Sequence, residues 1–179
     1  MTRKAKKPQE LNPFFHHLEK ETERACAVLG TALVDSRLKD LFKRRLIQNQ
    51  KMLVHLLDFT GPLSEFGVRI HVARALAWID GPAAEDLQVI AKVRNRFAHV
   101  ADHTFSFASD EIKGLCAGLR SSQGFLAGIE DRNVALKDKI SAKVAEGLKA
   151  KFGESRIRYQ VAVESLTWYL DKCAGKAPV

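Results

Sequence analysis

The sequence predicts an all-α protein that folds as a single compact bundle of about six to eight helices. Apolar residues recur at three- and four-residue steps through most of the 179-residue chain, which is the spacing of one helix face. No stretch alternates apolar and polar residues between hairpin turns, so we expect no strands. A chain of this length with 46% hydrophobic residues can bury one sizeable core but is short for two domains.

The first predicted helix begins near the N-terminus. Asn12 followed by Pro13 is typical of a helix start, because Asn caps free N–H groups and Pro has none to satisfy. We expect a hinge near Asp35, after which helical spacing continues over residues 38–57. The face that the spacing predicts to be buried before the hinge comprises Phe15, Leu18, Thr22, Ala25, Leu29 and Ala32.

Turn-forming residues divide the rest of the chain. The tripeptides 60–62 (Thr-Gly-Pro) and 80–82 (Asp-Gly-Pro) interrupt helical spacing. Residues 101–108 are predicted to form a loop, and Ser109 can cap the helix that follows. The helices predicted between these breaks cover residues 63–79, 83–100, 109–119, 134–151 and 154–173.

The chain is basic, with a net charge of +8. Residues 1–10 hold four basic residues against a single Glu10, so this segment explains only part of the excess. We expect it to be a flexible arm, and residues 11–175 to form the single helical domain. Basic surfaces attract anionic partners such as nucleic acid, but they also keep a protein in solution. DNA binding is therefore an open possibility at this point.

Several classes of site lack their sequence signature. Cys26, Cys116 and Cys173 lie far apart and form no CxxC pair, which indicates reduced thiols rather than disulfides or a zinc site. No histidine, cysteine or carboxylate recurs at a ligand spacing, and the chain has no glycine-rich phosphate loop. We expect no metal and no cofactor. No apolar run is long enough to span a membrane, and no secretory signal is present, so we expect a cytoplasmic protein.

Arg94 is the first candidate site residue. It follows Ile90 by four residues and precedes Phe97 by three, which places it on the face that the spacing predicts to be apolar. An arginine cannot lose its charge, so burying it without a partner would be costly. We expect a carboxylate or carbonyl partner, with Glu65 on the preceding helix as the first choice and a neighbouring chain as the alternative.

Asn95 and His99 extend this candidate site. They are four residues apart and therefore share one helix face, whereas Arg94 and His99 are about 140° apart around the helix. Arg94 and His99 can converge only if the helix end unwinds or a second element completes the site. Guanidinium, amide and imidazole groups together could bind phosphate or perform acid–base chemistry. The alternative is a structural network that locks the loop after His99.

Arg69 is the last member of the predicted polar cluster, which thus contains Glu65, Arg69, Arg94, Asn95 and His99. It lies between Phe66 and Ala73 on a mostly apolar face. We expect its aliphatic stem to pack against the core while its head reaches solvent, as is common for arginine.

Four segments of the chain carry a resemblance to a known family: ERACAVLGTALVDSRLKDLF (23–42), GPLSEFGVRIHVARALAWI (61–79), DLQVIAKVRNRFAH (86–99) and FSFASDEIKGLC (105–116). Together they resemble the mannitol operon repressor family, over about residues 12–120 and, more loosely, the last helix.

The resemblance implies an all-α fold, a regulatory role in sugar-alcohol uptake and utilisation, and self-association, so we expect a homodimer. It supplies no DNA-reading element, and the sequence contains no convincing helix-turn-helix. We therefore expect a transcriptional regulator that is not an enzyme and that acts through a protein partner at least as readily as on DNA.

A shorter segment suggests a different activity. The string RNRFAH (94–99) is similar to the Arg-x4–6-His motif of HEPN-domain ribonucleases, which are also small helical bundles. The similarity implies Arg94 and His99 as a catalytic pair at a dimer interface, with Asn95 supporting them and no metal required. A ribonuclease and a plain protein-interaction module are thus the alternatives to the regulator.

Overall fold

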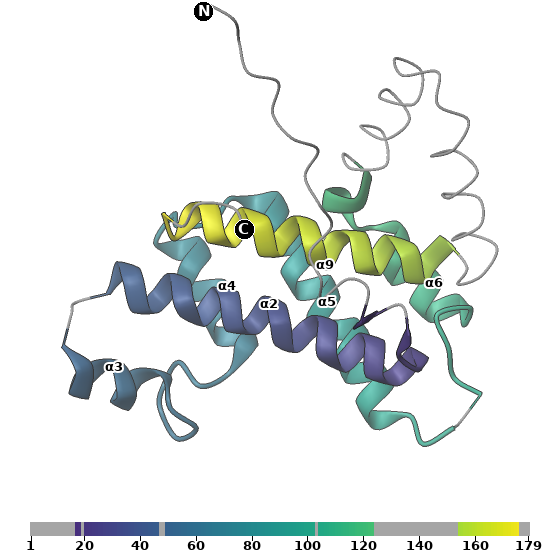
Figure 1. Cartoon of the computed structure of the whole chain (residues 1–179), viewed down its shortest axis with the longest axis horizontal. Coiled ribbons are helices and arrows are strands. Elements are labelled where there is room, and N and C mark those ends of the chain that lie inside the picture. The colour runs from purple at the N-terminus through teal and green to yellow at the C-terminus, as the bar shows by residue number, and fades with distance from the viewer. Residues whose placement is uncertain (1–16, 19, 47–48, 103, 124–153, 176–179) are drawn as a thin grey trace, which may run out of the picture.

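The protein is described by a computed structural model, which covers residues 17–18, 20–46, 49–102, 104–123 and 154–175 (Figure 1). Within these residues the chain is helical and has no strand, which confirms the predicted all-α class. The arm predicted over residues 1–10, the Asn12–Pro13 helix start and the helix predicted over 134–151 lie outside them. The helices are α2 (Glu23–Arg45), α3 (Gln50–Leu57), α4 (Phe66–Ala75), α5 (Gly81–His99), α6 (Asp110–Ala117) and α9 (Glu154–Cys173).

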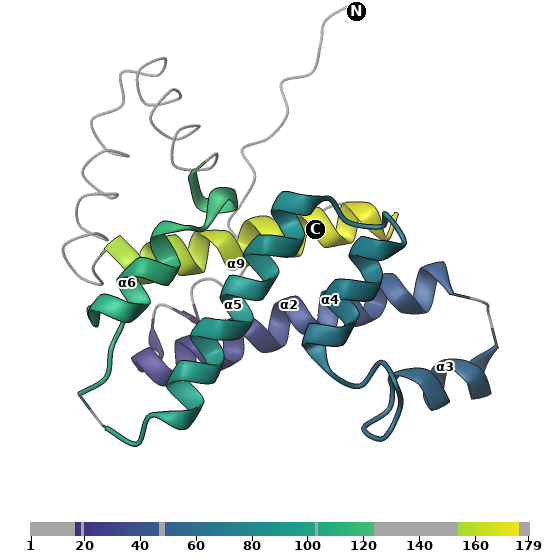
Figure 2. The same cartoon turned by 180° about the vertical axis from the view of Figure 1, so that it is seen from behind.

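The helices form two layers. α2 and α9 lie side by side and run in the same direction (Figure 1). Arg156 at the start of α9 pairs with Glu23 at the start of α2, at 2.7 Å between Nη1 and Oε1. At the other end, Arg45 donates to the carbonyl of Cys173 at 2.8 Å. The second layer, on one side of the α2–α9 pair, consists of α4, α5 and α6 (Figure 2). α5 packs against α2, α4, α6 and α9.

The structure of α2 differs from the helix predicted for the start of the bundle. Thr22 caps the helix by accepting the N–H of Ala25 at 3.2 Å, and the helix continues without a break through Asp35. The hinge predicted near Asp35 is therefore wrong. Glu21 and Thr22 interrupt the helix before α2, so the predicted face does not continue past this point: Leu18 is buried as predicted, whereas Thr22, Leu29 and Ala32 are exposed. The residues of α2 that are buried are Cys26, Ala27, Gly30, Thr31, Val34, Leu38, Leu41 and Phe42.

α4 is shorter than the helix predicted over residues 63–79. Ala77 has a φ of 53°, a left-handed conformation that ends the helix. The N–H of Trp78 then bonds to the carbonyl of Ala73 at 2.9 Å, and the N–H of Ala77 to that of Arg74 at 3.1 Å. These two bonds form a Schellman motif, in which the closing bonds occupy carbonyls that the helix leaves free.

The remaining boundaries are close to those predicted. Asp80 caps α5 by accepting the N–H of Ala83 at 2.8 Å, and Pro82 fits the first turn because it has no N–H to satisfy. Ser109 precedes α6, although its side chain makes no capping bond to that helix. The described residues between α5 and α6 form a loop, as predicted, and α9 covers the predicted range of 154–173.

Aromatic residues join the two layers. Phe107 packs between Phe97 of α5 and Tyr159 of α9, with ring centroids 4.9 and 5.2 Å away. The hydroxyl of Tyr159 donates to the carbonyl of Ala27 on α2 at 2.7 Å. Gly30 allows this approach, because a Cβ at its position would lie 2.9 Å from Cε1 of Tyr159. α2 and α9 are therefore close enough to pack only because residue 30 has no side chain.

We predict that Gly30→Ala destabilises the protein by about 1–3 kcal/mol, because the added methyl group overlaps a buried ring that cannot turn away. Gly114→Ala in α6 is the matched control, since no atom lies within 4 Å of the added Cβ. Removing a helical glycine there should stabilise the protein by roughly 0.5–1 kcal/mol. Urea unfolding of both variants measures the difference. Equal stability of the two variants would contradict the tight contact.

Candidate functional site

The predicted polar cluster does not form in the described structure. Arg69 is fully buried, whereas Glu65, Arg94, Asn95 and His99 are exposed. The prediction that all five residues share a polar core site is therefore wrong. Arg69 belongs to the interior of the bundle, and the three exposed residues near the end of α5 belong to its surface.

The structure places the Arg69 side chain in the interior, which is the opposite of the prediction. Its head was expected in solvent, yet the side chain is 0% exposed. Its guanidinium pairs with the carboxylate of Asp35 on α2 and donates to the carbonyls of Leu63 and Ser64, the latter at 2.6 Å. Sequence reasoning missed Asp35 as the partner, because it interpreted that residue as a helix break. The signal that could have found the pair is an aspartate in the middle of a helix otherwise suited to burial.

The same contact explains the segment GPLSEFGVRI (61–70). Arg69 holds the carbonyls of Leu63 and Ser64 before α4 begins, and Ile70 beside it lies in the core. Gly61 is required for a different reason: a Cβ there would lie 2.4 Å from the carbonyl oxygen of His55. No side chain can fit at this distance from the backbone. The segment is thus a structural joint between α3 and α4.

Arg94 does not leave α5 from the core-facing side. The residues that reach the core from this part of α5 are Ile90, Val93 and Phe97. Val93 follows Ile90 by three residues and Arg94 follows it by four, so both positions fit helical spacing and only tertiary packing distinguishes them. The predicted partner is also wrong, because Arg94 donates to Oδ1 of Asn95 at 2.8 Å and Glu65 makes no contact with it.

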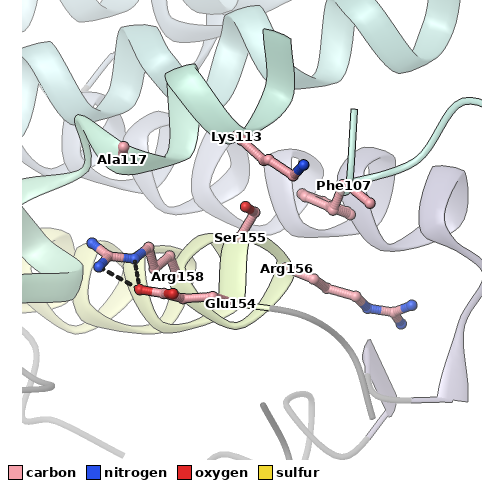
Figure 3. Close-up of a pocket in the computed structure, with 8 residues that line it drawn as sticks. Phe107, Lys113, Ala117, Glu154, Ser155, Arg156 and Arg158 are labelled. Carbon is pink, nitrogen blue, oxygen red and sulfur yellow. Dashed lines mark hydrogen bonds and ion pairs between the residues drawn. The ribbon is translucent and has the colours of Figure 1, made fainter. Parts of the chain in front are cut away.

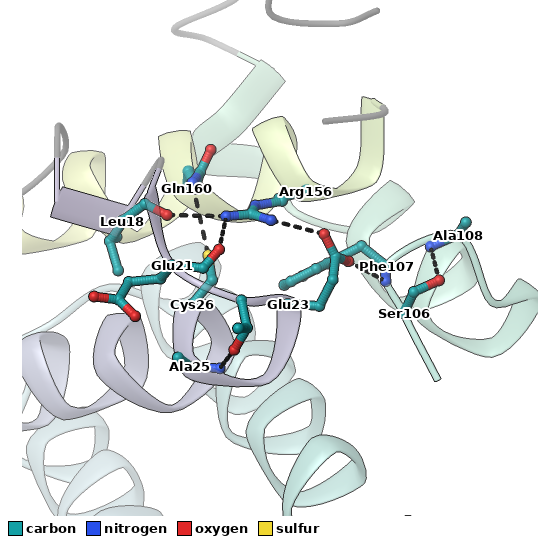
Figure 4. A network of polar contacts seen from close by, with 11 residues as sticks. Leu18, Glu21, Glu23, Ala25, Cys26, Ser106, Phe107, Ala108, Arg156 and Gln160 are labelled. Carbon is teal, nitrogen blue, oxygen red and sulfur yellow. Dashed lines mark hydrogen bonds and ion pairs between the residues drawn. The ribbon is translucent and has the colours of Figure 1, made fainter. Parts of the chain in front are cut away.

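A second buried arginine was not among the predicted site residues. Arg156 is 4% exposed, and it pairs with Glu23 and donates to the carbonyls of Leu18 at 3.0 Å and Glu21 at 2.7 Å (Figure 4). Glu23 in turn accepts the N–H of Phe107 at 2.7 Å. The network joins the segment before α2, the start of α9 and the loop before α6. Its role is structural.

A pocket of about 350 Å³ lies between α6 and the start of α9 (Figure 3). The cations around it already have anionic partners. Arg158 donates twice to Glu154, at 3.0 and 2.6 Å, and Lys113 contacts Asp110 at 3.1 Å. The pocket therefore offers an anionic ligand little uncompensated charge. The residues that line it are Phe107, Ala108, Lys113, Ala117, Glu154, Ser155, Arg156 and Arg158.

Cys26 and Cys116 are not activated as nucleophiles. Burial raises the pKa of the Cys26 thiol to about 11 and that of the Cys116 thiol to about 12. The reactive thiolate is therefore scarce at neutral pH at both positions. In the part of the chain that the structure describes, no three His, Cys, Asp or Glu residues are grouped so that they could hold a metal ion.

The surface that remains is the polar face near the end of α5. We call it the α5 face and define it by Lys92, Arg94, Asn95, Arg96 and His99, all of which are exposed. Arg96 forms an exposed ion pair with Glu111, whereas neither Lys92 nor Arg94 has a carboxylate partner among the described residues. The α5 face is thus basic, accessible and rich in hydrogen-bond donors.

Several contacts hold the loop that follows α5. Arg24 of α2 donates to the carbonyl of Val100 at 2.6 Å. Phe105 packs edge-on against Phe97, with ring centroids 5.1 Å apart, and Arg96 spans the loop by pairing with Glu111 of α6. Among the described residues, none of these contacts involves Arg94, Asn95 or His99, which are exposed.

We predict that Asp35→Ala lowers the free energy of unfolding by about 3–5 kcal/mol, because it leaves the charge of Arg69 buried without a carboxylate. Glu85→Ala is the control, since it removes a carboxylate from an exposed pair with Arg120. Such pairs contribute about 0–1 kcal/mol. Urea unfolding followed by circular dichroism compares the variants. If both lose the same small amount, the Arg69 contact is not a main determinant of stability.

Comparison with known proteins finds no relative of this chain. The chain matches no family model, no curated protein and no solved structure. Among the described residues, no helix combines the length and the apolar character needed to cross a membrane. The function of the chain must therefore be argued from its own residues, and above all from the α5 face.

Proposed function

We propose that the protein is a transcriptional regulator of the kind represented by the mannitol operon repressor family, and that it acts through a protein partner rather than as an enzyme. The observation that carries the proposal is the exposure of Arg94, Asn95 and His99 on the α5 face. These residues belong to one of the segments in which the sequence resembles that family. They neither fill the core nor hold the neighbouring loop.

The other resembling segments supply the support for this face. Residues 23–42 form most of α2, and residues 61–79 contain the buried Arg69 and the whole of α4. α2 and α4 both pack against α5. The segments that resemble the family are thus of two kinds: those that form the buried interior, and the end of α5, which presents polar side chains on the surface. This division is what a protein that acts by surface recognition requires, because recognition residues work best on rigid elements.

The start of α5 argues against direct reading of DNA bases. In a helix-turn-helix, the first residues of the second helix reach the base edges. α5 begins with Gly81 and Pro82, followed by two buried alanines and then Glu85, whose charge would repel phosphate. The α4–α5 pair therefore lacks the side chains of a recognition helix, which favours a protein partner.

We predict that deleting the gene raises expression of the mannitol operon in its native host, and that the wild-type gene restores repression. Arg94→Glu should fail to restore it, because it reverses charge on the α5 face without disturbing the core. Lys172→Glu is the control and should repress normally, because it reverses an exposed charge at the end of α9, which contacts the start of α5 rather than its end. A transcriptional reporter measures expression, with protein abundance checked by immunoblot. Unchanged expression after deletion would rule out the proposed role.

Metal-independent RNA cleavage is a second candidate function, favoured by one observation. Arg94 has no carboxylate partner among the described residues, and both Arg94 and His99 are exposed at the surface of α5. An arginine and a histidine at a surface can bind a phosphodiester and transfer a proton. Because the two residues are five apart on one helix, this activity would require a second copy to complete the site.

For this candidate, we predict that purified protein cleaves single-stranded RNA in the presence of a chelator and that His99→Ala abolishes the cleavage. His71→Ala is the matched control, because His71 is an exposed histidine on α4 outside the motif. Labelled RNA resolved on a denaturing gel provides the measurement. Equal residual cleavage by wild type and His99→Ala would identify a contaminant and end the ribonuclease hypothesis.

A further inference from the structure

α3 and the turn after it carry more apolar surface than the chain covers. We call residues 50–60 the α3 arm. Leu53 and Leu57 point inward and are buried, and they form the centre of a broad apolar arc on this amphipathic helix. The flanks of the arc are open, with exposed fractions of 46% for Met52, 49% for Val54 and 92% for Phe59. An apolar surface of this kind indicates a binding site.

The arm lies at the edge of the bundle. In both views α3 stands beyond the end of α2, away from the body formed by the other helices (Figures 1 and 2). It also packs less closely on the other helices than they pack on one another. A partner could therefore approach its open flank without displacing any part of the core.

Phe59 is held in its exposed position. Its N–H donates to the carboxylate of Asp58 at 2.8 Å, and the N–H of Gly61 donates to the carbonyl of Asp58 at 2.8 Å. The N–H of Leu63 then bonds back to the carbonyl of Leu56 at 2.9 Å. The turn is tight, since Gly61 has no room for a Cβ. These bonds fix the backbone at Phe59, so binding would restrict little besides the rotation of its own side chain.

Basic residues lie at the start of the arm, whereas the anchor lies past the end of α3. Lys43, Arg44 and Arg45 form the last turn of α2, and Lys51 lies on α3 itself. Arg44 and Lys51 have no carboxylate partner in the described part of the chain. A second copy of the chain would bring the same positive charges to a symmetric contact, which disfavours self-association here. A nucleic acid would satisfy the cations but leave the apolar arc without complementary surface.

We infer that the α3 arm binds an acidic protein segment that carries apolar side chains, with Phe59 as the anchor and Arg44 and Lys51 as the flanking cations. The inference rests on the proposed function in one respect, because it names the chemistry of the protein partner through which the regulator acts. An amphipathic acidic helix fits best, since its apolar side chains at three- and four-residue spacing match those of α3.

Fluorescence anisotropy with the full-length protein tests the inference. The probe is a labelled 18-residue helical peptide with Leu and Phe at three- and four-residue spacing and Glu at most other positions. A second peptide replaces each Glu by Lys, and a labelled single-stranded oligonucleotide is the third probe. We expect the Glu peptide to bind at least about tenfold more tightly than the Lys peptide, and to weaken as salt is raised.

Substitutions on the arm should weaken binding of the Glu peptide. Phe59→Ala removes an anchor whose side chain is almost fully exposed, so folding is preserved and affinity should fall by at least about tenfold. Arg44→Glu and Lys51→Glu should each weaken it and flatten its salt dependence. Val28→Ala on α2 and Lys20→Glu before the start of α2 are matched exposed controls that should bind as the wild type does.

Three results would overturn the inference. Unchanged affinity of Phe59→Ala would remove the anchor. Displacement of the Glu peptide by the oligonucleotide at equal concentration would assign the arm to nucleic acid. A dimer in sedimentation experiments that Phe59→Ala dissociates would assign it to a second copy.

The peptide assay and the operon reporter test separate claims. Peptide binding that depends on Phe59, together with unchanged reporter expression after deletion, would leave the arm as a docking site and reject the regulatory role. Normal repression by a Phe59→Ala variant that no longer binds the peptide would keep the regulatory role and reject the arm as the partner site.

Discussion

The charge of Arg69 must be compensated inside the protein, and this constraint organises one end of the bundle. An arginine cannot become neutral when it is buried, so the fold has to supply oxygen atoms around it. Asp35 supplies them from α2, and Leu63 and Ser64 supply them from the turn before α4. α4 is thereby positioned against α2, and the α5 helix that follows its closing turn is positioned with it.

α2 holds the acidic partners of both buried arginines. Asp35 pairs with Arg69 of α4, and Glu23 pairs with Arg156 of α9. Each guanidinium also donates to two backbone carbonyls in the segment that precedes α4 or α2, so each pair fixes that segment as well as a helix. Removing either carboxylate would leave an uncompensated charge in the interior, whereas exposed pairs elsewhere contribute little.

This frame leaves two surfaces for interaction. One is the α5 face, where polar side chains project from a helix whose other sides are packed. The other is the α3 arm, where an exposed Phe59 lies on a turn held by backbone hydrogen bonds and basic residues lie at the start of the arm. Neither is an enclosed cavity. Both suit the binding of another macromolecule better than the binding of a small substrate, which is consistent with the regulatory function that we propose.

Local sequence signals predict the helical class and the approximate ends of α5, α6 and α9, because periodicity, capping residues and Gly-Pro breaks act over short distances. Asp80 with Pro82 predicts the start of α5, and the spacing over residues 154–173 predicts all of α9. Such signals could not predict which face of α2 is buried. That face depends on the interruption at Glu21 and Thr22 and on the close packing of Gly30 against Tyr159.

Only the tertiary structure decided which arginine is buried. Arg69 and Arg94 both lie at helical spacing from apolar neighbours. Because residues three and four positions apart both fit such spacing, it does not decide which of two adjacent residues faces the core. For α5, Val93 occupies the core position and Arg94 turns outward, where it bonds to Asn95. For α4, the arginine itself occupies the core, because Asp35 and two carbonyls lie within its reach. The partners that make burial of a charge tolerable come from distant parts of the chain, and local sequence cannot reveal them.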